Sequence, residues 1–266
     1  MPHHARGPTL RLRHGLRVTR RSDGQLQVGL HPDDRAVLPD ADDVRGLLRD
    51  LTHGVSADQV TARVAPVLDL LRSRGLVVGL DEASGPAERR AGTRVGVVAN
   101  DPARATVVRL LALADLQVAG RGAAPAVMLH VTTGAEPRRE VLDQWVRDDL
   151  PHLTLTSLAG RTRLGPFVVP GRTACLRCVD EHATDRDPRH PLVLEQHHAV
   201  DPGDPVRPED LQLALAWAVR DLACWADGRH PVTWSATVEV GAGDPGVHAW
   251  RRHPRCGCAW GDLLAG

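Results

Sequence analysis

Two closely spaced pairs of cysteines constrain this chain more than any other feature. Cys175 and Cys178 form a C-x-x-C within GPFVVPGRTACLRCVDEHATDRDPRHP, and Cys256 and Cys258 form a C-x-C within HPRCGC near the C-terminus. Thiolates at such short spacings can each hold one side of a tetrahedral zinc ion. The two pairs together predict a closed four-cysteine zinc site that ties the C-terminal segment back to position 175.

Such a zinc site would be structural, because four thiolates leave no open position at which the metal could activate water. The alternatives are two unrelated pairs, or reduced buried thiols. His253 is a substitute ligand, although four cysteines make it more suited to a place outside the ligand set. Cys224 is expected to pack as a small core residue. The adjacent residues His197 and His198 cannot face one site on a regular element, so both are expected to be exposed.

The composition excludes several classes of function. The 266 residues include 33 basic and 33 acidic side chains, so no global field draws the protein to nucleic acid or to a membrane. Lysine is absent, which excludes any chemistry that needs it. The sequence has neither a secretory signal nor an apolar run of the roughly 18 residues that span a bilayer. Cysteines paired in this way are typical of metal ligation in the cytosol, so a cytoplasmic protein is expected.

The first part of the chain has the pattern of a winged helix. Residues 1–15 are rich in Arg and His and are expected to be flexible, and the winged-helix domain is predicted to span residues 16–82. Within it, Ser56 and Gln59 fit a capping box, and Pro66 is expected to split the stretch 56–74 into two helices. The expected strands and the remaining helix lie at Leu16–Arg20, Gln25–Leu30, Arg35–Leu38, Leu76–Leu80 and Val44–Leu51.

A winged helix can bind DNA or a peptide. DNA binding needs a basic recognition helix, but residues 62–74 combine three arginines with Asp69 and an apolar face. Peptide capture needs instead an open strand edge beside a helix. A peptide would then add a strand next to Arg35–Leu38 and place its side chains against the third helix.

The rest of the chain predicts an α/β domain. Residues 83–92 are polar and contain Gly and Pro, which indicates a linker. Strand and helix patterns then alternate over residues 93–157, which favours a parallel sheet of βαβ units. The turn at 98–104 (VANDPAR) lacks glycine and places Asp101 where a nucleotide phosphate would lie, so ATP is not expected to bind. No G-x-S-x-G or other nucleophile motif is present, and no catalytic residue is predicted.

Three further segments complete the predicted α/β domain. Residues 182–189 are expected to be irregular, and Pro208–Asp227 has the pattern of a long helix. Val232–Val240 alternates as a strand does, with Val247–Arg251 as its hairpin partner.

Three of these stretches together resemble a known family. GPFVVPGRTACLRCVDEHATDRDP, DGRHPVTWSATVEV and HPRCGC are similar to the ThiF-like proteins of thiazole/oxazole-modified peptide (TOMM) biosynthesis, which are leader-peptide-binding, ocin-ThiF-like partners of cyclodehydratases. LRVTRRSDGQLQVGLHPDDRAVLPD resembles the start of their winged-helix RiPP recognition element. The resemblance covers nearly the whole chain, and it is strongest at 165–191 and 253–258 and weak at 93–150.

The resemblance implies a fold and a division of labour. Residues 16–82 would bind the leader of a ribosomally synthesised precursor peptide, and residues 93–266 would be a degenerate adenylating-enzyme (Rossmann-type) scaffold with a zinc knuckle. A separate YcaO cyclodehydratase would form the azolines. The four paired cysteines correspond to the structural zinc ligands of the family. The residues that correspond to its peptide-binding strand and groove are Arg35, Ala36, Val37, Leu38, Val64, Val67, Leu68, Leu71 and Arg72.

The sequence thus predicts a non-catalytic protein that binds a leader peptide and carries structural zinc. Two other functions stay open: an ATP-dependent adenylating enzyme that acts on a peptide, and a zinc-containing winged-helix regulator that binds DNA. Related scaffolds tend to dimerise, so a homodimer is an open expectation as well. The identity of the precursor peptide and the choice between thiazole and oxazole do not follow from the sequence.

Overall fold

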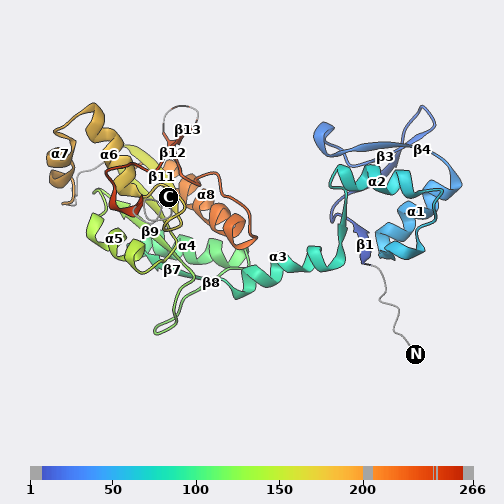
Figure 1. Ribbon diagram of the computed structural model, residues 1–266, viewed down its shortest axis with the longest axis horizontal. Helices are drawn as coiled ribbons and strands as arrows, with labels where there is room; N and C mark the ends of the chain where they lie inside the picture. Colours follow the sequence, from blue (N-terminus) through green and yellow to red (C-terminus); the bar gives the residue numbers. More distant parts are fainter. Residues whose placement is uncertain (1–7, 200–205, 242, 244, 260–266) are drawn as a thin grey trace. The chain divides into compact units, whose positions relative to one another are not determined.

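The chain folds as two units, residues Met1–Ala87 and Glu88–Gly266 (Figure 1). The computed structural model describes residues 8–199, 206–241, 243 and 245–259. Helix α3 (Leu80–Gly92) includes the boundary between the units, so the segment 83–92, which was expected to be a linker, is helical. No helix of the described ranges combines the length and the hydropathy needed to cross a membrane.

The first unit contains two three-stranded antiparallel sheets, ordered β5-β1-β6 and β2-β3-β4. Helices α1 and α2 and the one-turn 3₁₀ helices η1 and η2 complete the unit. The elements of the first unit are β1 (Thr9–Leu12), β2 (Val18–Arg20), β3 (Gln25–Val28), η1 (Pro32–Asp34), β4 (Ala36–Pro39), α1 (Asp42–His53), β5 (Val55–Ser56), η2 (Ala57–Gln59), α2 (Ala65–Ser73) and β6 (Val77–Gly79).

The structure changes one expectation at the N-terminus, bears out the capping box, and places the break within residues 56–74 at 60–64, before Pro66. Strand β1 lies within residues 1–15, because Leu10 and Leu12 are buried in the core of the first unit; residues 1–7 lie outside the described part. The capping box between Ser56 and Gln59 is present at η2. Pro66 stands in the first turn of α2, where its missing N–H leaves no helical hydrogen bond unmade.

The second unit is built on a seven-stranded mixed sheet, ordered β13-β12-β11-β10-β9-β7-β8. Strands β10, β9, β7 and β8 are parallel, as the βαβ pattern predicted, whereas β11, β12 and β13 join in antiparallel fashion. The strands are β7 (Arg94–Val98), β8 (Gln117–Val118), β9 (Val127–Thr133), β10 (His152–Leu158), β11 (Arg161–Val168), β12 (Ala236–Val240) and β13 (Gly246–Ala249).

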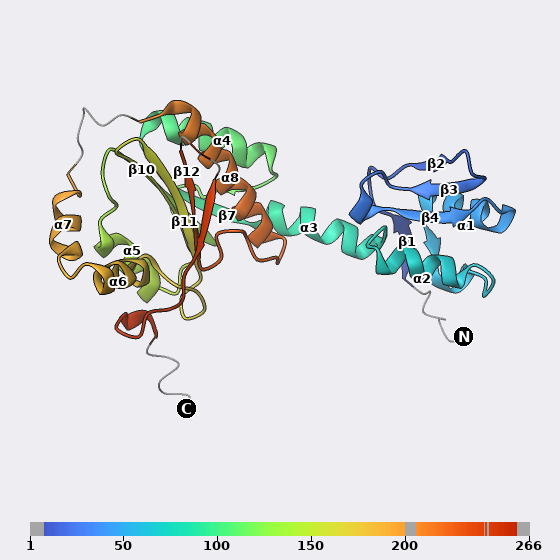
Figure 2. The same cartoon turned by 90° about the horizontal axis from the view of Figure 1, so that it is seen from above.

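Helices cover both faces of this sheet (Figure 2). On one face α4 and α8 pack against β7, β10, β11 and β12. The apolar residues of these helices and strands form the main core, which includes Leu111, Leu155 and Leu222. On the other face Trp145 of α5 packs against the His130 and His152 rings of the sheet. The helices are α4 (Asp101–Leu113), α5 (Arg139–Arg147), α6 (Leu176–Arg186), α7 (His190–Gln196) and α8 (Pro208–Ala226).

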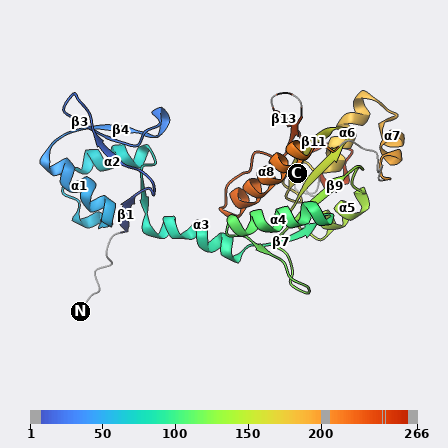
Figure 3. The ribbon, with the colours of Figure 1, turned by 180° about the vertical axis from the view of Figure 1, so that it is seen from behind.

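Two segments of the second unit differ from their sequence-based expectations. Residues 182–186, expected to be irregular, belong to α6. The strand expected from Val232 begins only at Ala236, since Thr233 turns inward and donates both its N–H and its hydroxyl to Asp221 of α8, at 3.0 and 2.6 Å. The reverse view shows α4 and α8 side by side on their face of the sheet (Figure 3).

Candidate functional site

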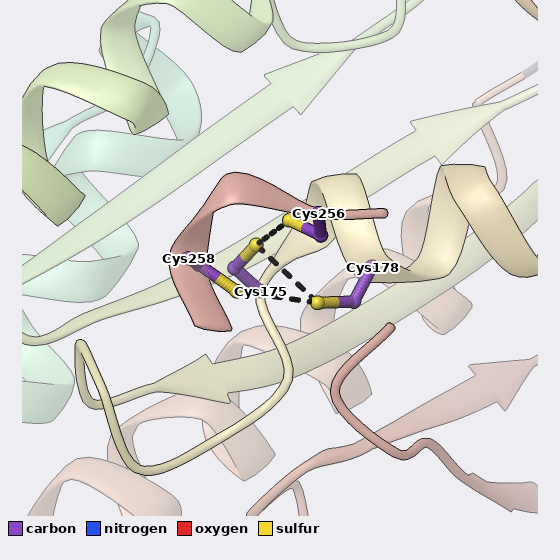
Figure 4. Close-up of side chains that lie close together, drawn as sticks. All are labelled: Cys175, Cys178, Cys256 and Cys258. Carbon is purple, nitrogen blue, oxygen red and sulfur yellow. Dashed lines mark hydrogen bonds between the residues drawn. The ribbon is translucent and has the colours of Figure 1, made fainter. Parts of the chain in front are cut away.

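The four paired cysteines meet at one point of the second unit (Figure 4). Cys175 is the N-cap of α6 and Cys178 lies in its first turn, while the other two belong to the segment that enters the 3₁₀ helix η3 (Gly257–Ala259). The Sγ atom of Cys175 lies 3.8 Å from that of Cys178 and 3.5 Å from that of Cys256. The Sγ atoms of Cys178 and Cys258 are 3.4 Å apart.

These distances fit a tetrahedral metal. Four sulfurs at the usual zinc–sulfur distance occupy corners about 3.8 Å apart, close to the separations seen here. A disulfide would need a bond of about 2.05 Å, and all five cysteines are free. Cys175, Cys178 and Cys256 are buried and Cys258 is half-buried, so a bound ion would be largely shielded from water. The donor set and its burial are therefore compatible with a structural zinc site.

The electrostatics of the cluster favour a bound cation. The hydrogen bond from Cys175, followed by those from Cys256 and Cys258, lowers the pKa of Cys178. The hydrogen bond from Cys175 also lowers the pKa of Cys258 to about 7. The hydrogen bond between Cys175 and Cys178 raises the pKa of Cys175, because the thiol of Cys175 is the donor of that bond. Thiolates at these positions would place negative charge in a buried site, which a divalent cation would compensate.

His253, the substitute ligand, lies beside the cluster and is used otherwise. Its buried ring bonds Asp185 through Nε2 at 3.0 Å and accepts the N–H of Arg255 at Nδ1 at 3.2 Å. Arg255 in turn pairs with Asp185 at 2.6 Å and with Glu181 at 3.0 Å. This network ties the segment that carries Cys256 to α6 and holds the two cysteine pairs in register, and His253 is not part of the four-cysteine group.

The other residues considered as ligands from the sequence, His197, His198 and Cys224, fall outside the four-cysteine cluster. His197 is exposed as expected, but the side chain of His198 is only 9% exposed, and its Nδ1 lies 3.2 Å from the carbonyl oxygen of Glu136. That contact with a main-chain oxygen accounts for its burial. Cys224 is half-buried on α8, with its Sγ 3.4 Å from the carbonyl oxygen of His230.

The strand predicted to receive a peptide, β4, is an outer strand of its sheet and pairs with β3 among the described residues. Helix α2 packs beside it. Arg35 and Val37 are exposed, whereas the alternating residues Ala36 and Leu38 face the core. Strand β4 therefore offers a backbone edge together with the outward side chain of Val37, and the exposed Arg35 directly precedes it.

The side chains predicted on the helix divide in the same way. Val64, Leu68 and Leu71 are buried in the core of the first unit, so they support α2 rather than face a ligand. Val67 is half-buried and Arg72 is exposed. Of the five side chains predicted on the helix, only Val67 and Arg72 keep exposed surface.

The opposite edge of the same sheet has a cavity that the sequence reasoning missed. It has a volume of about 300 Å³ and lies between β2 and α1. Its apolar walls include Val18 and Leu48, and its arginines are Arg20, Arg45 and Arg49. Arg45 already pairs with Asp40 and Asp42. The sequence signal was present in the arginines one turn apart on α1, but their alignment with β2 depends on the fold.

The carboxyl ends of β7 and β9 mark the place where an α/β sheet of this kind binds a nucleotide. Asn100, the N-cap of α4, donates its amide to the hydroxyl of Thr133 at 3.0 Å and so bridges the two strand ends. Asp101 occupies the first turn of α4, where an anionic phosphate would meet a like charge. This geometry agrees with the glycine-free turn seen in the sequence.

Solved structures share this fold over nearly the whole chain. The heterocyclase TruD superimposes with a TM-score of 0.72 at 18% identity, over 95% of this chain and 43% of that one. A heterocyclase in complex with substrate and cofactor gives a TM-score of 0.72 at 16% identity, over 95% and 39%. The microcin C7 biosynthetic enzyme MccB in complex with N-formylated MccA gives a TM-score of 0.64 at 10% identity, over 94% and 99%.

These likenesses show the fold that the chain adopts. The chain spans less than half the length of the two heterocyclase chains, and almost the full length of MccB. No protein-family model and no curated protein sequence matches it. The chain is a two-unit α/β protein with the fold of TruD and MccB and a cluster of four cysteines compatible with a metal.

Proposed function

We propose that this chain binds the leader region of a ribosomally synthesised precursor peptide and presents the peptide to a separate YcaO cyclodehydratase, which forms the azolines. The observation that carries the proposal is the likeness to TruD, a heterocyclase, over 95% of this chain, both units included. The chain matches 43% of TruD, less than half of that chain's length.

The local geometry supports the two parts of this role. The open edge of β4 beside α2 is suited to adding a peptide strand, in which main-chain hydrogen bonds give affinity and alternate side chains give specificity. The four-cysteine cluster would hold structural zinc through Cys175, Cys178, Cys256 and Cys258, and would fix the C-terminal segment to α6. A non-catalytic role agrees with the bridged strand ends at Asn100 and Thr133.

The test is a reconstituted reaction. The full chain, a YcaO enzyme, ATP and a precursor peptide with its leader should give loss of water from Cys, Ser or Thr residues, measured by mass spectrometry. The same mixture without this chain, or with a precursor that lacks its leader, should give little product. Equal product with and without this chain would contradict the proposal.

A second candidate is an adenylating enzyme that acts on a peptide. The observation in its favour is the likeness to MccB, a biosynthetic enzyme, over 99% of that chain. The Asn100–Thr133 bridge and Asp101 argue against it. Peptide-dependent exchange of pyrophosphate into ATP would support this candidate and exclude the non-catalytic role. A homodimer and a cytoplasmic location stay predictions under either candidate.

A further inference from the structure

The largest of the described cavities in the second unit has a volume of about 490 Å³. It lies between the strands β11, β12 and β13 on one side and the helices α6 and α7 on the other. Its apolar wall consists of Val179, Leu194, Val247 and the ring of Trp250. Its polar wall contains arginines, carboxylates and two histidines, and no role has so far been given to any of them.

The carboxylates of this cavity already have partners. Arg139 donates to Asp180 through Nε at 2.8 Å and through Nη2 at 3.0 Å, and it also pairs with Glu136 at 3.1 Å. Arg163 approaches both oxygens of Glu136, at 2.9 and 3.0 Å. Burial alone would raise the pKa of Glu136, but Arg163 and Arg139 outweigh it and lower that pKa. The charged form of Glu136 is thus fixed in place.

The third acidic side chain of the cavity is paired as well. Glu239 lies 3.5 Å from Arg161, and both side chains are more than half exposed. The acidic groups of this wall are therefore neutralised by the protein itself, and none of them needs a cation from outside.

Two arginines of the cavity keep donors to spare. Arg163 gives only its Nη2 to Glu136, and its buried Nε has no hydrogen-bond partner. A buried donor without a partner is uncommon in native structures and calls for an acceptor. The exposed Arg186 forms no ion pair with the described residues, and its guanidinium lies 5.9 Å from the ring of Trp250. The hydrogen-bond donors of the cavity that lack a partner therefore belong to positively charged guanidinium groups.

The apolar wall is held rigidly beside these donors. The indole N–H of Trp250 is engaged by the hydroxyl of Thr237 at 2.9 Å, which fixes the ring. The ring of His248 lies against the same ring, with the centroids 4.1 Å apart and the planes tilted by 55°. A fixed aromatic face next to guanidinium groups with unused donors suits a ligand that carries an anionic group on an apolar or peptide body.

We infer that this cavity binds a carboxylate of a peptide, held by Arg186 and Arg163 with the adjoining residue against Trp250. The inference deepens the proposed function, on which its peptide ligand rests, by adding a second contact for the precursor outside its leader. Arginine is suited to this role because its planar guanidinium meets a carboxylate in a bidentate manner. The carboxylate can belong to an acidic side chain or to a peptide C-terminus.

The test follows the indole N–H signal of Trp250 by NMR in the full chain, assigned with Trp250→Phe. The probes are N-acetyl-glutamyl amide, which carries a side-chain carboxylate, N-acetyl-phenylalanine, which carries a C-terminal one, and inorganic phosphate. One or both carboxylate probes should shift the signal in a saturable way. Arg186→Gln should weaken that binding by about tenfold or more, the loss of one charge-assisted hydrogen bond. Because Arg186 is exposed, this variant should keep its fold.

The controls separate this site from other binding. Arg109→Gln removes an exposed arginine of α4, outside the cavity, and should leave the affinity unchanged. Arg163→Gln should weaken binding in parallel with Arg186→Gln. Equal affinity in wild type and Arg186→Gln, absence of a saturable shift, or tighter binding of phosphate than of both carboxylates would each overturn the inference.

This experiment can fail independently of the proposed function. Leader affinity is measured with a labelled leader peptide and depends on the first unit, whereas the Trp250 signal reports on the second. If the protein binds the leader but Trp250 does not respond to the carboxylate probes, the cavity inference alone is overturned. If the protein does not bind the leader but Trp250 shows a saturable, Arg186-dependent shift, the leader-binding role is overturned and the carboxylate site is kept.

Discussion

The Sγ of Cys178 lies 3.4 Å from the Sγ of Cys258, although 80 positions separate them in the chain. This contact joins the start of α6 to the C-terminal segment, and the network of His253, Asp185 and Arg255 supports the same junction. A metal at this point would close a long loop of the second unit. It would therefore act on stability rather than on chemistry.

The first prediction concerns this cluster. Cys256→Ser should remove the zinc and lower the free energy of unfolding by about 4 kcal/mol or more, since loss of a structural metal is among the few single changes with so large an effect. The measurements are metal content by mass spectrometry and denaturation followed by tryptophan fluorescence. All six tryptophans lie after residue 144, so the fluorescence reports on the second unit. Cys224→Ser is the matched control, and a wild-type protein without bound zinc would contradict the prediction.

The second prediction distinguishes the two edges of the sheet β2-β3-β4. If the leader adds to β4, Arg72→Glu on α2 should weaken its binding by about tenfold at low salt, through loss of a charge contact and gain of a repulsive one. Arg49→Glu, beside the cavity at β2, should have little effect. The measurement is fluorescence anisotropy of a labelled leader at two salt concentrations. The reverse order of effects would place the leader at β2.

Sequence patterns were sufficient wherever a contact repeats along a single element. The helix expected at Val44–Leu51 is present as α1, and its apolar residues at helical spacing, Val44, Leu47, Leu48 and Leu51, are all buried. The parallel strands β7, β9 and β10 follow from the alternation of strand and helix. The cysteine spacing brought together four residues that do lie together.

Other features depend on tertiary contacts that no local pattern contains. Arg139 and Asp180 are 41 positions apart and meet only because α5 and α6 pack on one face of the sheet. The sequence analysis did not predict strand β1, because the alternating Leu10 and Leu12 lie within a stretch rich in arginine. The division of the α2 residues into buried and exposed ones likewise required the neighbouring sheet.

The third prediction concerns Gly165, which adopts a φ of +96°. A Cβ at this position would clash with the carbonyl oxygen of Ala236 and press against Thr233. Gly165→Ala should therefore destabilise the second unit by about 2 kcal/mol or more, from the strained backbone and the clash together. Gly171→Ala is the matched control, because it has a φ of +71° but open space around it. Equal losses in both variants would show that the clash contributes nothing.

The fourth prediction concerns the response of stability to acid. His152 is fully buried between Trp145 and the sheet, with Nδ1 3.0 Å from the carbonyl oxygen of Leu150 and Nε2 unpartnered. Burial lowers the pKa of His152 to about 4, from 6.5. Between these values the unfolded chain binds a proton that the folded chain does not, so the free energy of unfolding falls as the pH falls.

Protonation of His152 should lower the free energy of unfolding by about 3 kcal/mol in total as the pH drops from 6.5 to about 4. His152→Phe lacks the titrating ring, so its unfolding free energy should fall less steeply over the upper part of this range, above the titration of ordinary carboxylates. His31→Phe, which replaces an exposed histidine of the first unit, should keep the wild-type slope. The measurement is urea denaturation at a series of pH values, followed by tryptophan fluorescence. A His152→Phe slope equal to that of the wild type would mean that the buried ring takes up its proton in the folded state.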